Sequence, residues 1–191
     1  MRKLSVIRSA LSQKNVYDKL FPTLDRCYVR SYEEEDLKIP LFYSQDPDAQ
    51  ALGRWFARQS TVPDIFIVSN AERVLQTLRI MILDQGRLEM IPWNMDRDVI
   101  AIDGESQEQT CRRAQEWIKE ARKRYSNWHV CLIADHRFVL AVRKILERWN
   151  EEDFLRISRD LKPGYCDMAE YRGRRLSLEY FNRNFLIEEN A

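Results

Sequence analysis

The pattern of hydrophobic and polar residues predicts alternating strands and helices. Three short runs are rich in residues that favour strands, and the last two are mostly apolar, which is typical of strands that are buried in a sheet. These runs are Lys3–Arg8, Asp64–Ser69 and His129–Ala134. Because helical patterns separate them, we expect the α/β class with a mostly parallel sheet.

Four further runs carry apolar residues at helical spacing. They are Asp48–Gln59, Ala71–Leu83, a long segment that begins near Ser106, and Phe138–Trp149. Asn70 is the expected N-cap of the second helix, and Ser106 with Gln109 is the expected capping box of the third.

The remaining segments have weaker patterns. Asp167–Tyr171 and Leu176–Phe181, on either side of a turn at Gly173, predict a hairpin at one edge of the sheet. Two polar stretches, Tyr17–Tyr43 and Gln85–Asp103, predict irregular excursions, which in α/β folds often cover the ligand crevice. A chain of 191 residues with no low-complexity linker is expected to form one domain over 1–191.

Composition and charge narrow the functional classes. A net charge of +1 argues against a general nucleic-acid binder. No apolar run is long enough to cross a bilayer, and the stretch after Met1 is too short for a signal peptide. We therefore expect a cytoplasmic protein with no membrane partner. Four scattered cysteines without a CxxC pair, and only two histidines, predict reduced thiols and no metal site, and no cofactor is assigned.

Polar residues follow each of the three buried strands. Arg8 ends the first strand, Arg73 lies one turn into the helix after the second, and His136 follows the third. Ligands of parallel sheets bind beyond the carboxyl ends of the strands, where helix N-termini also favour anions. Each residue by itself is more often an ordinary surface or core group. Their coincidence predicts an anion pocket, with phosphate as the natural ligand.

The residues around these positions resemble the histidine phosphatase (phosphoglycerate mutase-like) superfamily. The first motif of that family is an apolar strand, Arg-His-Gly, any residue, Ser or Thr, two residues, and Asn. Arg8, Ser12 and Asn15 fall on this motif, whereas Ser9 occupies the position of the nucleophilic histidine. The resemblance extends over nearly the whole chain and implies a three-layer α/β/α sandwich.

Three further segments carry the resemblance. Ser69, Arg73 and Thr77 match a Ser-x-x-x-Arg-x-x-x-Thr signature, His136 matches the second histidine of the family, and Leu88-Glu89 resembles the segment with the acid/base carboxylate. The resemblance therefore implies phosphate-binding roles for Arg8, Asn15, Arg73 and His136. It also implies catalytic positions at Ser9, Glu89 and His136.

The departures from the family all fall at the chemical centre. Besides Ser9, Ala10 and Arg137 replace the glycines beside the two histidines, and Asp135 replaces a hydroxyl residue. A serine hydroxyl is a poor nucleophile without a neighbouring base. Its shorter side chain also loses the near-attack geometry. The charges of Asp135 and Arg137 are expected to narrow or occupy the pocket.

These features lead to one main hypothesis and three alternatives. The main one is a degenerate histidine phosphatase-like module that keeps an anion pocket for inorganic phosphate, a phosphorylated small molecule or a phosphoprotein. The alternatives are an active phosphatase that uses water or Ser9, a Ser9 introduced to trap a ligand, and an interaction protein whose pocket is filled by an Asp135–Arg8 or Asp135–Arg73 salt bridge. A homodimer through the hairpin or an edge strand stays open.

Overall fold

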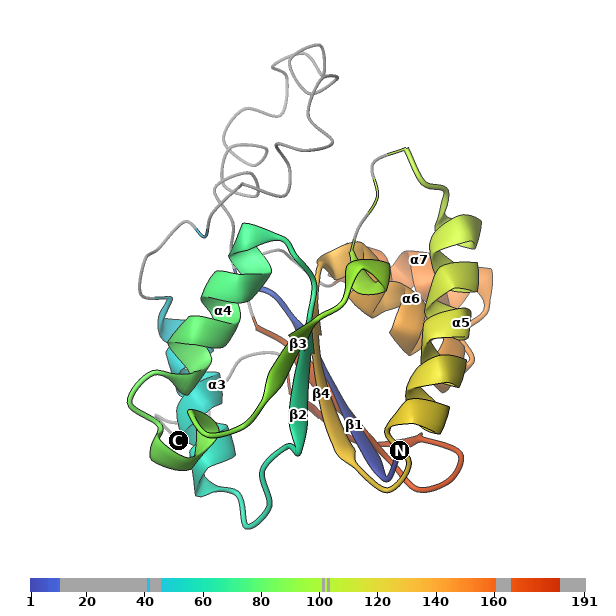
Figure 1. Cartoon of the computed structure of the whole chain (residues 1–191). Coiled ribbons are helices and arrows are strands. Elements are labelled where there is room, and N and C mark those ends of the chain that lie inside the picture. Colours follow the sequence, from blue (N-terminus) through green and yellow to red (C-terminus); the bar gives the residue numbers. More distant parts are fainter. Residues whose placement is uncertain (11–40, 42–45, 101, 103, 161–165, 183–191) are drawn as a thin grey trace, which may run out of the picture.

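A computed structural model of the chain describes residues 1–10, 41, 46–100, 102, 104–160 and 166–182. Its centre is a six-stranded sheet with the strand order β3-β2-β4-β1-β5-β6 (Figure 1). The strands are β1 (Lys3–Arg8), β2 (Ile65–Val68), β3 (Trp93–Met95), β4 (His129–Ala134), β5 (Met168–Arg172) and β6 (Ser177–Asn182). The first four are parallel to one another, and β5 is antiparallel to both β1 and β6.

Helices cover both faces of this sheet, as the resemblance implied. The helices are α3 (Pro47–Arg58), α4 (Glu72–Ile82), α5 (Gln107–Arg124), α6 (His136–Glu147) and α7 (Glu151–Asp160), with short turns η2 (Gly86–Leu88) and η3 (Arg97–Val99). Helices α3 and α4 lie on one face, and α5 and α6 lie on the other (Figure 1). The three-layer α/β/α sandwich is therefore confirmed.

Two separate cores follow from the alternation of side chains along the strands. Leu4 and Val6 of β1 face α5 and α6, where they join Trp117 and Phe138 in one apolar cluster. Ile7 faces the opposite side and packs in the second cluster with residues of α3 and α4. Because both faces of the central strands are covered, every residue of β1, β2 and β4 is buried.

Most of the predicted elements are confirmed, and two details are wrong. The first and last buried strands match β1 and β4, the capping box of Ser106 with Gln109 is present, and the hairpin forms β5 and β6 with β6 at the sheet edge. Asn70 is not the N-cap of α4. Ala71 occupies that position, and its N–H donates to the Ser69 hydroxyl at 3.4 Å.

The second error concerns the stretch Gln85–Asp103, which is not wholly irregular. It contains β3, which pairs in parallel with β2 from Phe66↔Trp93 to Val68↔Met95. A strand of three exposed residues is too short to show an alternating pattern. Helix α7 was not predicted either. The predicted excursion Tyr17–Tyr43 lies almost entirely outside the described residues.

Two negative findings apply to the described part of the chain. No helix there combines the length and the apolar composition that crossing a membrane requires. No group of three or more His, Cys, Asp or Glu side chains there is arranged to hold a metal ion. Cys111, Cys131 and Cys166 are free thiols, whereas Cys27 lies outside the described ranges.

Candidate functional site

The carboxyl ends of β1, β2 and β4 bring together Arg8, Arg73 and His136. Arg8 is the last residue of β1, Arg73 lies in the first turn of α4, and His136 is the first residue of α6. The β1 end is held in place by two backbone bonds, from the Arg8 N–H to the Asp167 carbonyl (3.1 Å) and from the Ser9 N–H to the Ala134 carbonyl (3.0 Å). The Arg8 Nη1 atom lies 3.3 Å from His136 Nδ1.

The contact with Arg8 determines the protonation state of His136. A guanidinium only donates hydrogen bonds, so the Nδ1 atom of His136 accepts and carries no proton. Burial, and then the charges of Arg8 and Arg137, lower the pKa of His136 to about 4. The imidazole is therefore neutral at pH 7. Among these three residues, only Arg8 and Arg73 therefore carry a positive charge at pH 7.

Each of the two guanidiniums also faces a buried carboxylate. Arg73 Nε lies 2.5 Å from Asp135 Oδ1, and Arg8 Nε forms an ion pair with Asp167 Oδ1. Asp167 immediately precedes β5, and because β5 runs antiparallel to β1 its first residues lie beside the end of β1. All four side chains are nearly excluded from solvent. The formal charges of Arg8, Arg73, Asp135 and Asp167 sum to zero, so this part of the pocket is already neutralised.

Asp135 is placed to pair with Arg73 and not to cap its own helix. It stands at the N-cap position of α6, yet its side chain makes no capping hydrogen bond to the helix. Arg137 is exposed, so it does not fill the pocket; its charge reaches only the groups around it, including His136 and Glu105. Of the two charges expected to narrow the site, only Asp135 occupies it.

In the described part of the chain, no base is hydrogen-bonded to the Ser9 hydroxyl. Ser9 is half-buried, and among the described residues no hydrogen bond joins its hydroxyl to the imidazole of His136. Ala10 is buried, and its N–H donates to the Thr77 hydroxyl (3.1 Å), which itself donates to the Arg73 carbonyl (2.7 Å). These bonds tie the β1 end to α4 and orient Arg73. They do not activate the Ser9 hydroxyl.

Two further candidates are not brought to this pocket. Glu89 is exposed and directly follows η2. Arg87 of η2 donates to the Ala57 carbonyl (2.7 Å) near the end of α3. This region lies at the end of the sheet where β2 begins, away from the carboxyl ends of the strands (Figure 1). The physical reason is that α4 carries the chain back across the sheet before Glu89 is reached. Ser12 and Asn15 lie outside the described residues.

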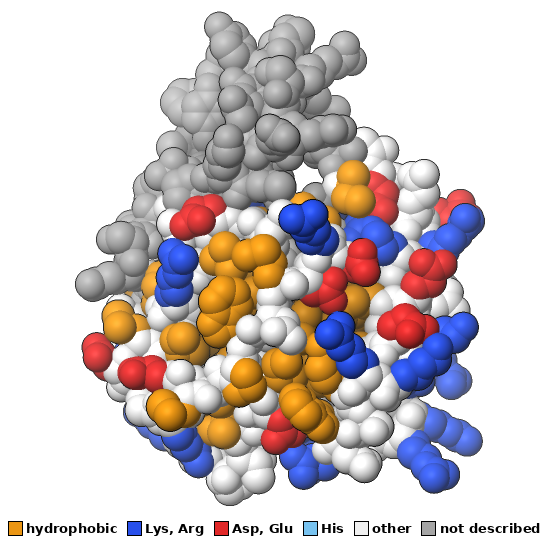
Figure 2. Space-filling view, in the orientation of Figure 1, with side chains coloured by type: hydrophobic (Ala, Val, Ile, Leu, Met, Phe, Trp, Pro, Cys, Tyr) orange, Lys and Arg blue, Asp and Glu red, His pale blue; other side chains and the backbone are white. Residues whose placement is uncertain are grey.

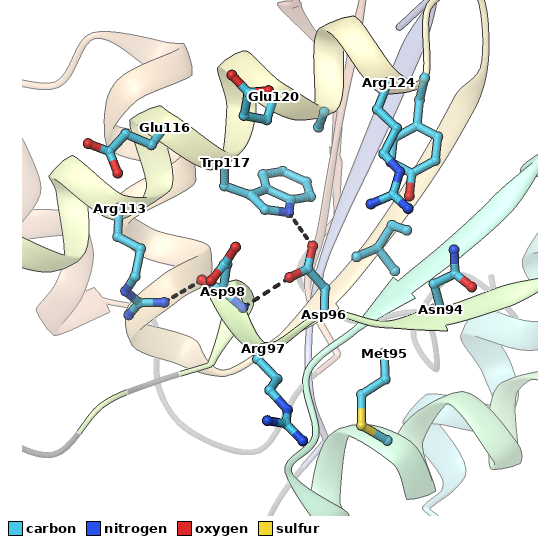
Figure 3. A pocket seen from close by; sticks show the side chains of 13 residues that line it. Asn94, Met95, Asp96, Arg97, Asp98, Arg113, Glu116, Trp117, Glu120 and Arg124 are labelled. Atoms are coloured by element: carbon cyan, nitrogen blue, oxygen red, sulfur yellow. Dashed lines mark hydrogen bonds between the residues drawn. The ribbon is translucent and has the colours of Figure 1, made fainter.

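The structure instead places an unpredicted carboxylate at the carboxyl end of β3. Asp96 accepts hydrogen bonds from Trp117 Nε1 (3.1 Å) and from the Asp98 N–H (3.0 Å). It lines a cavity of about 680 Å³ between β3 and α5, on the α5 side of the sheet (Figure 3). The only sequence signal for Asp96 is its place after the short run Pro92–Met95, which the pattern did not identify as a strand.

Comparisons with known proteins show what this geometry is similar to. No protein-family model matches the chain, and no curated protein matches it. Among solved structures, mycobacterial hydrolase 1 aligns with a TM-score of 0.69 at 14% identity, over 96% of this chain and 99% of that one.

Two phosphatases align over nearly their whole length as well. The phosphoserine phosphatase of Entamoeba histolytica, in complex with 3-phosphoglyceric acid, has a TM-score of 0.68 at 13% identity, covering 96% of this chain and 98% of that one. The mycobacterial glucosyl-3-phosphoglycerate phosphatase has a TM-score of 0.62 at 13% identity, covering 95% and 97%. At these identities the likeness shows the phosphoglycerate mutase-like fold alone.

Proposed function

We propose that this chain is a degenerate histidine phosphatase-like protein, a binding or regulatory module that holds a phosphate group without phosphohistidine chemistry. The observation that supports this proposal is the end of β1. Ser9 stands where a nucleophilic histidine is expected, and its hydroxyl has no bond to the one imidazole of the pocket. A hydroxyl without a base to take its proton reacts poorly with a phosphorus centre.

The pocket keeps the groups that bind an anion. Arg8 and Arg73 project from two different elements toward one edge of the sheet, and guanidiniums offer the planar pair of donors that suits phosphate. The neutral His136 supplies one further donor, at Nε2, because its Nδ1 accepts from Arg8. Inorganic phosphate, a phosphorylated small molecule and a phosphoprotein all present this chemistry.

Asp135 makes the affinity conditional. A phosphate that takes two bonds from Arg73 competes with the carboxylate now 2.5 Å from its Nε atom. Two negative groups about 4 Å apart repel by roughly 4 kcal/mol at an effective dielectric of about 20. The bound state therefore requires Asp135 to withdraw or to take up a proton. Such coupling suits a sensor more than a high-turnover enzyme.

Hydrolysis of p-nitrophenyl phosphate tests the catalytic part. The purified chain and its Ser9→Ala variant are both expected to give rates indistinguishable from the buffer. Turnover at an ordinary enzyme rate would overturn the proposal. If Ser9→Ala also abolished that turnover, the alternative of an active phosphatase with a serine nucleophile would be supported.

A second candidate function is favoured by the Arg73–Asp135 ion pair itself. In that case the carboxylate fills the pocket permanently, and the protein acts only through its surface. Calorimetric titration with inorganic phosphate separates the two candidates. The anion-binding module gives a saturable signal that Arg73→Gln removes, whereas the filled pocket gives no signal with either protein.

A further inference from the structure

A basic surface lies at the end of the sheet where β1 and β4 begin, away from the anion pocket (Figure 1). It is built from residue 2, the last turn of α5, the turn before β4 and the turn between β5 and β6. Its exposed basic residues are Arg2, Arg122, Lys123, Arg172, Arg174 and Arg175. Figure 2 shows Lys and Arg side chains gathered around the end of α5. Segments that are distant in the sequence therefore bring these basic groups together.

Hydrogen bonds hold the segments of the basic surface against one another. The Trp128 carbonyl accepts from the Arg2 N–H (2.8 Å), and the Arg2 carbonyl accepts from the Gly173 N–H (3.2 Å). Arg122 of α5 donates to the Arg175 carbonyl (3.4 Å). Gly173 has a φ of 79°, which glycine adopts without strain, so the turn between β5 and β6 closes tightly. The basic side chains are thus displayed on a well-connected backbone.

The charges of the basic surface do not balance. Among the described residues, three carboxylates form ion pairs with its side chains, at distances between 2.8 and 3.5 Å. The pairs are Asp64–Arg2, Glu120–Lys123 and Glu179–Arg172. No described carboxylate forms an ion pair with Arg122, Arg174 or Arg175, so the surface keeps a surplus of three guanidiniums.

The other charges near the end of α5 do not remove this surplus. Arg124 is not counted, because it lines the cavity beside β3 together with Arg97 and Arg113 (Figure 3). The carboxylates that line that cavity are Asp96, Asp98, Glu116 and Glu120. Exposed Lys119 of α5 adds a further positive charge on the helix. The surplus at the basic surface therefore remains after every charge of the cavity is assigned.

An exposed tryptophan stands among these basic groups. The side chain of Trp128 is 42% exposed, and its ring centroid lies 5.8 Å from that of the buried Tyr125 ring. Asn127 adopts a left-handed φ of 67°, which asparagine tolerates better than most residues, and so turns the chain directly before Trp128. An exposed indole ring beside guanidiniums is a surface on which a nucleic-acid base can stack.

This combination fits a single-stranded nucleic acid better than other polyanions. Guanidiniums donate paired hydrogen bonds to phosphates, and bases offer flat faces that the carboxylates of an acidic peptide do not. A membrane surface also requires apolar side chains that insert, and Trp128 is the one large exposed apolar side chain among the described residues of this surface. The net charge of +1 sums the whole chain and does not describe a local surplus.

We propose that the basic surface binds single-stranded nucleic acid, with Arg122, Arg174 and Arg175 on the phosphates and Trp128 stacked on a base. The surface lies at the opposite end of the sheet from Arg8, so the inference does not depend on the function of the anion pocket.

Fluorescence anisotropy with a labelled RNA of about twelve nucleotides, and with DNA of the same sequence, tests the phosphate contacts. We expect saturable binding at low salt that the double variant Arg174→Gln/Arg175→Gln weakens by about ten-fold or more. Each phosphate contact contributes about 0.7 to the slope of log affinity against log salt, so the double variant should reduce that slope by about 1.4.

The matched control is Arg79→Gln/Arg112→Gln, which removes the same charge from exposed positions of α4 and α5. It should change neither the affinity nor the salt slope. Equal losses in the two double variants would overturn the inference, as would the absence of binding to both the RNA and the DNA.

The stacking contact and the class of partner are tested separately. Trp128→Ala should weaken binding by about five-fold or more, the usual worth of one stacked base. Trp93→Ala, at a tryptophan of similar exposure on β3, should not. An abasic strand of the same length should bind the parent chain and Trp128→Ala equally. Circular dichroism establishes that the variants are folded. Polyglutamate or anionic lipid vesicles that bind the parent chain as tightly as the RNA would contradict the inference, as would unchanged binding in Trp128→Ala.

Discussion

At the scale of single residues, the side chain that follows β4 forms an ion pair inside the pocket. Asp135 lies against Arg73, and Asp167 lies against Arg8, so each of these arginines already faces a carboxylate. His136 adds no positive charge, because burial and the neighbouring cations lower its pKa to about 4. The pocket thus holds two internal ion pairs, with which the proposed anion would compete.

Replacing Asp135 by asparagine should remove the carboxylate that competes with phosphate for Arg73. The change leaves the buried Arg73 without its carboxylate, so we expect a lower melting temperature and phosphate binding that is tighter by about ten-fold or more. Phosphate should raise the melting temperature of Asp135→Asn more than that of the parent protein. Asp98→Asn, at an exposed carboxylate after β3, is the control and should change neither quantity. Weaker binding in Asp135→Asn would contradict the model of competition.

A second residue-scale prediction concerns pH and His129. Burial, with Lys3 nearby, lowers the pKa of His129 to about 3, against about 6.5 when unfolded. The folded state therefore favours the neutral ring. Its contribution to stability is full above pH 6.5 and is lost as the pH falls from 6.5 toward 3, at up to about 1.4 kcal/mol per pH unit.

Urea unfolding between pH 7 and pH 4 measures this contribution. The ring donates from Nε2 to Ser5 (2.8 Å), whose hydroxyl donates to Glu170 (2.8 Å), and a glutamine amide can make the same bond. His129→Gln should therefore lose less stability on acidification than the parent chain. The separate variant His136→Gln should also lose less stability on acidification than the parent chain, because the pKa of His136 is lowered as well. An unchanged pH slope in both variants would be inconsistent with buried neutral rings.

At the scale of elements, close packing of α3 against α4 orients the helix that carries Arg73. Gly53 of α3 faces the α4 backbone so closely that a Cβ atom there would lie 2.1 Å from the Met81 carbonyl oxygen. The absence of a side chain at this position lets the two helices approach. The capping box of Ser106 and Gln109 similarly determines where α5 begins.

Gly53→Ala should therefore destabilise the protein although alanine is the better helix former. The helix preference for alanine is worth about 1 kcal/mol, but relieving the clash requires a backbone shift, and overpacking of this kind costs about 1–3 kcal/mol. Denaturant unfolding should show a net loss of stability. Gln50→Ala, at a half-buried position of α3, should have little effect. A stabilised Gly53→Ala variant would show that α3 and α4 can separate freely.

At the scale of the whole molecule, one buried arginine connects the pocket to the far end of α6. Arg143 Nε donates to Glu147 (2.8 Å), its Nη1 lies 3.9 Å from Asp167, and its guanidinium lies 4.2 Å from the Phe181 ring. Glu147 in turn accepts from the Tyr171 hydroxyl (2.6 Å). Helix α6, the hairpin and the partner of Arg8 therefore share a single polar network.

Arg143→Met should break this network at its centre. It leaves the buried Glu147 without its cation, whereas Asp167 keeps its ion pair with Arg8. Removing one partner of a buried pair costs about 3–5 kcal/mol. Arg112→Met, at an exposed i,i+4 pair with Glu108 on α5, is the matched control, with an expected cost below about 0.5 kcal/mol. Thermal and urea unfolding measure both variants. Equal losses in the two would contradict a structural role for the network.

The sequence predicted elements that depend on local interactions and missed those that depend on contacts between distant segments. Strands β1 and β4 and the start of α5 depend on local patterns of apolar residues and on a cap three residues apart, so they were predictable. Strand β3 has only three exposed residues and exists because β2 pairs with it. The positions of Asp96 and Glu89 also depend on tertiary structure. Only the path of the chain through α4 and β3 places Asp96 at the carboxyl ends of the strands and Glu89 away from them.

The sequence by itself determined the sandwich, the strand ends that carry Arg8, Arg73 and His136, and the serine at position 9. Only the tertiary structure decided how these groups are charged. Arg73 and Asp135 are 62 positions apart, and their pairing depends on how α4 and the end of β4 pack together. Burial then keeps His136 neutral and excludes solvent from the ion pairs. Local patterns encode where side chains stand, whereas the low-dielectric contacts that set their chemistry arise only when distant segments meet.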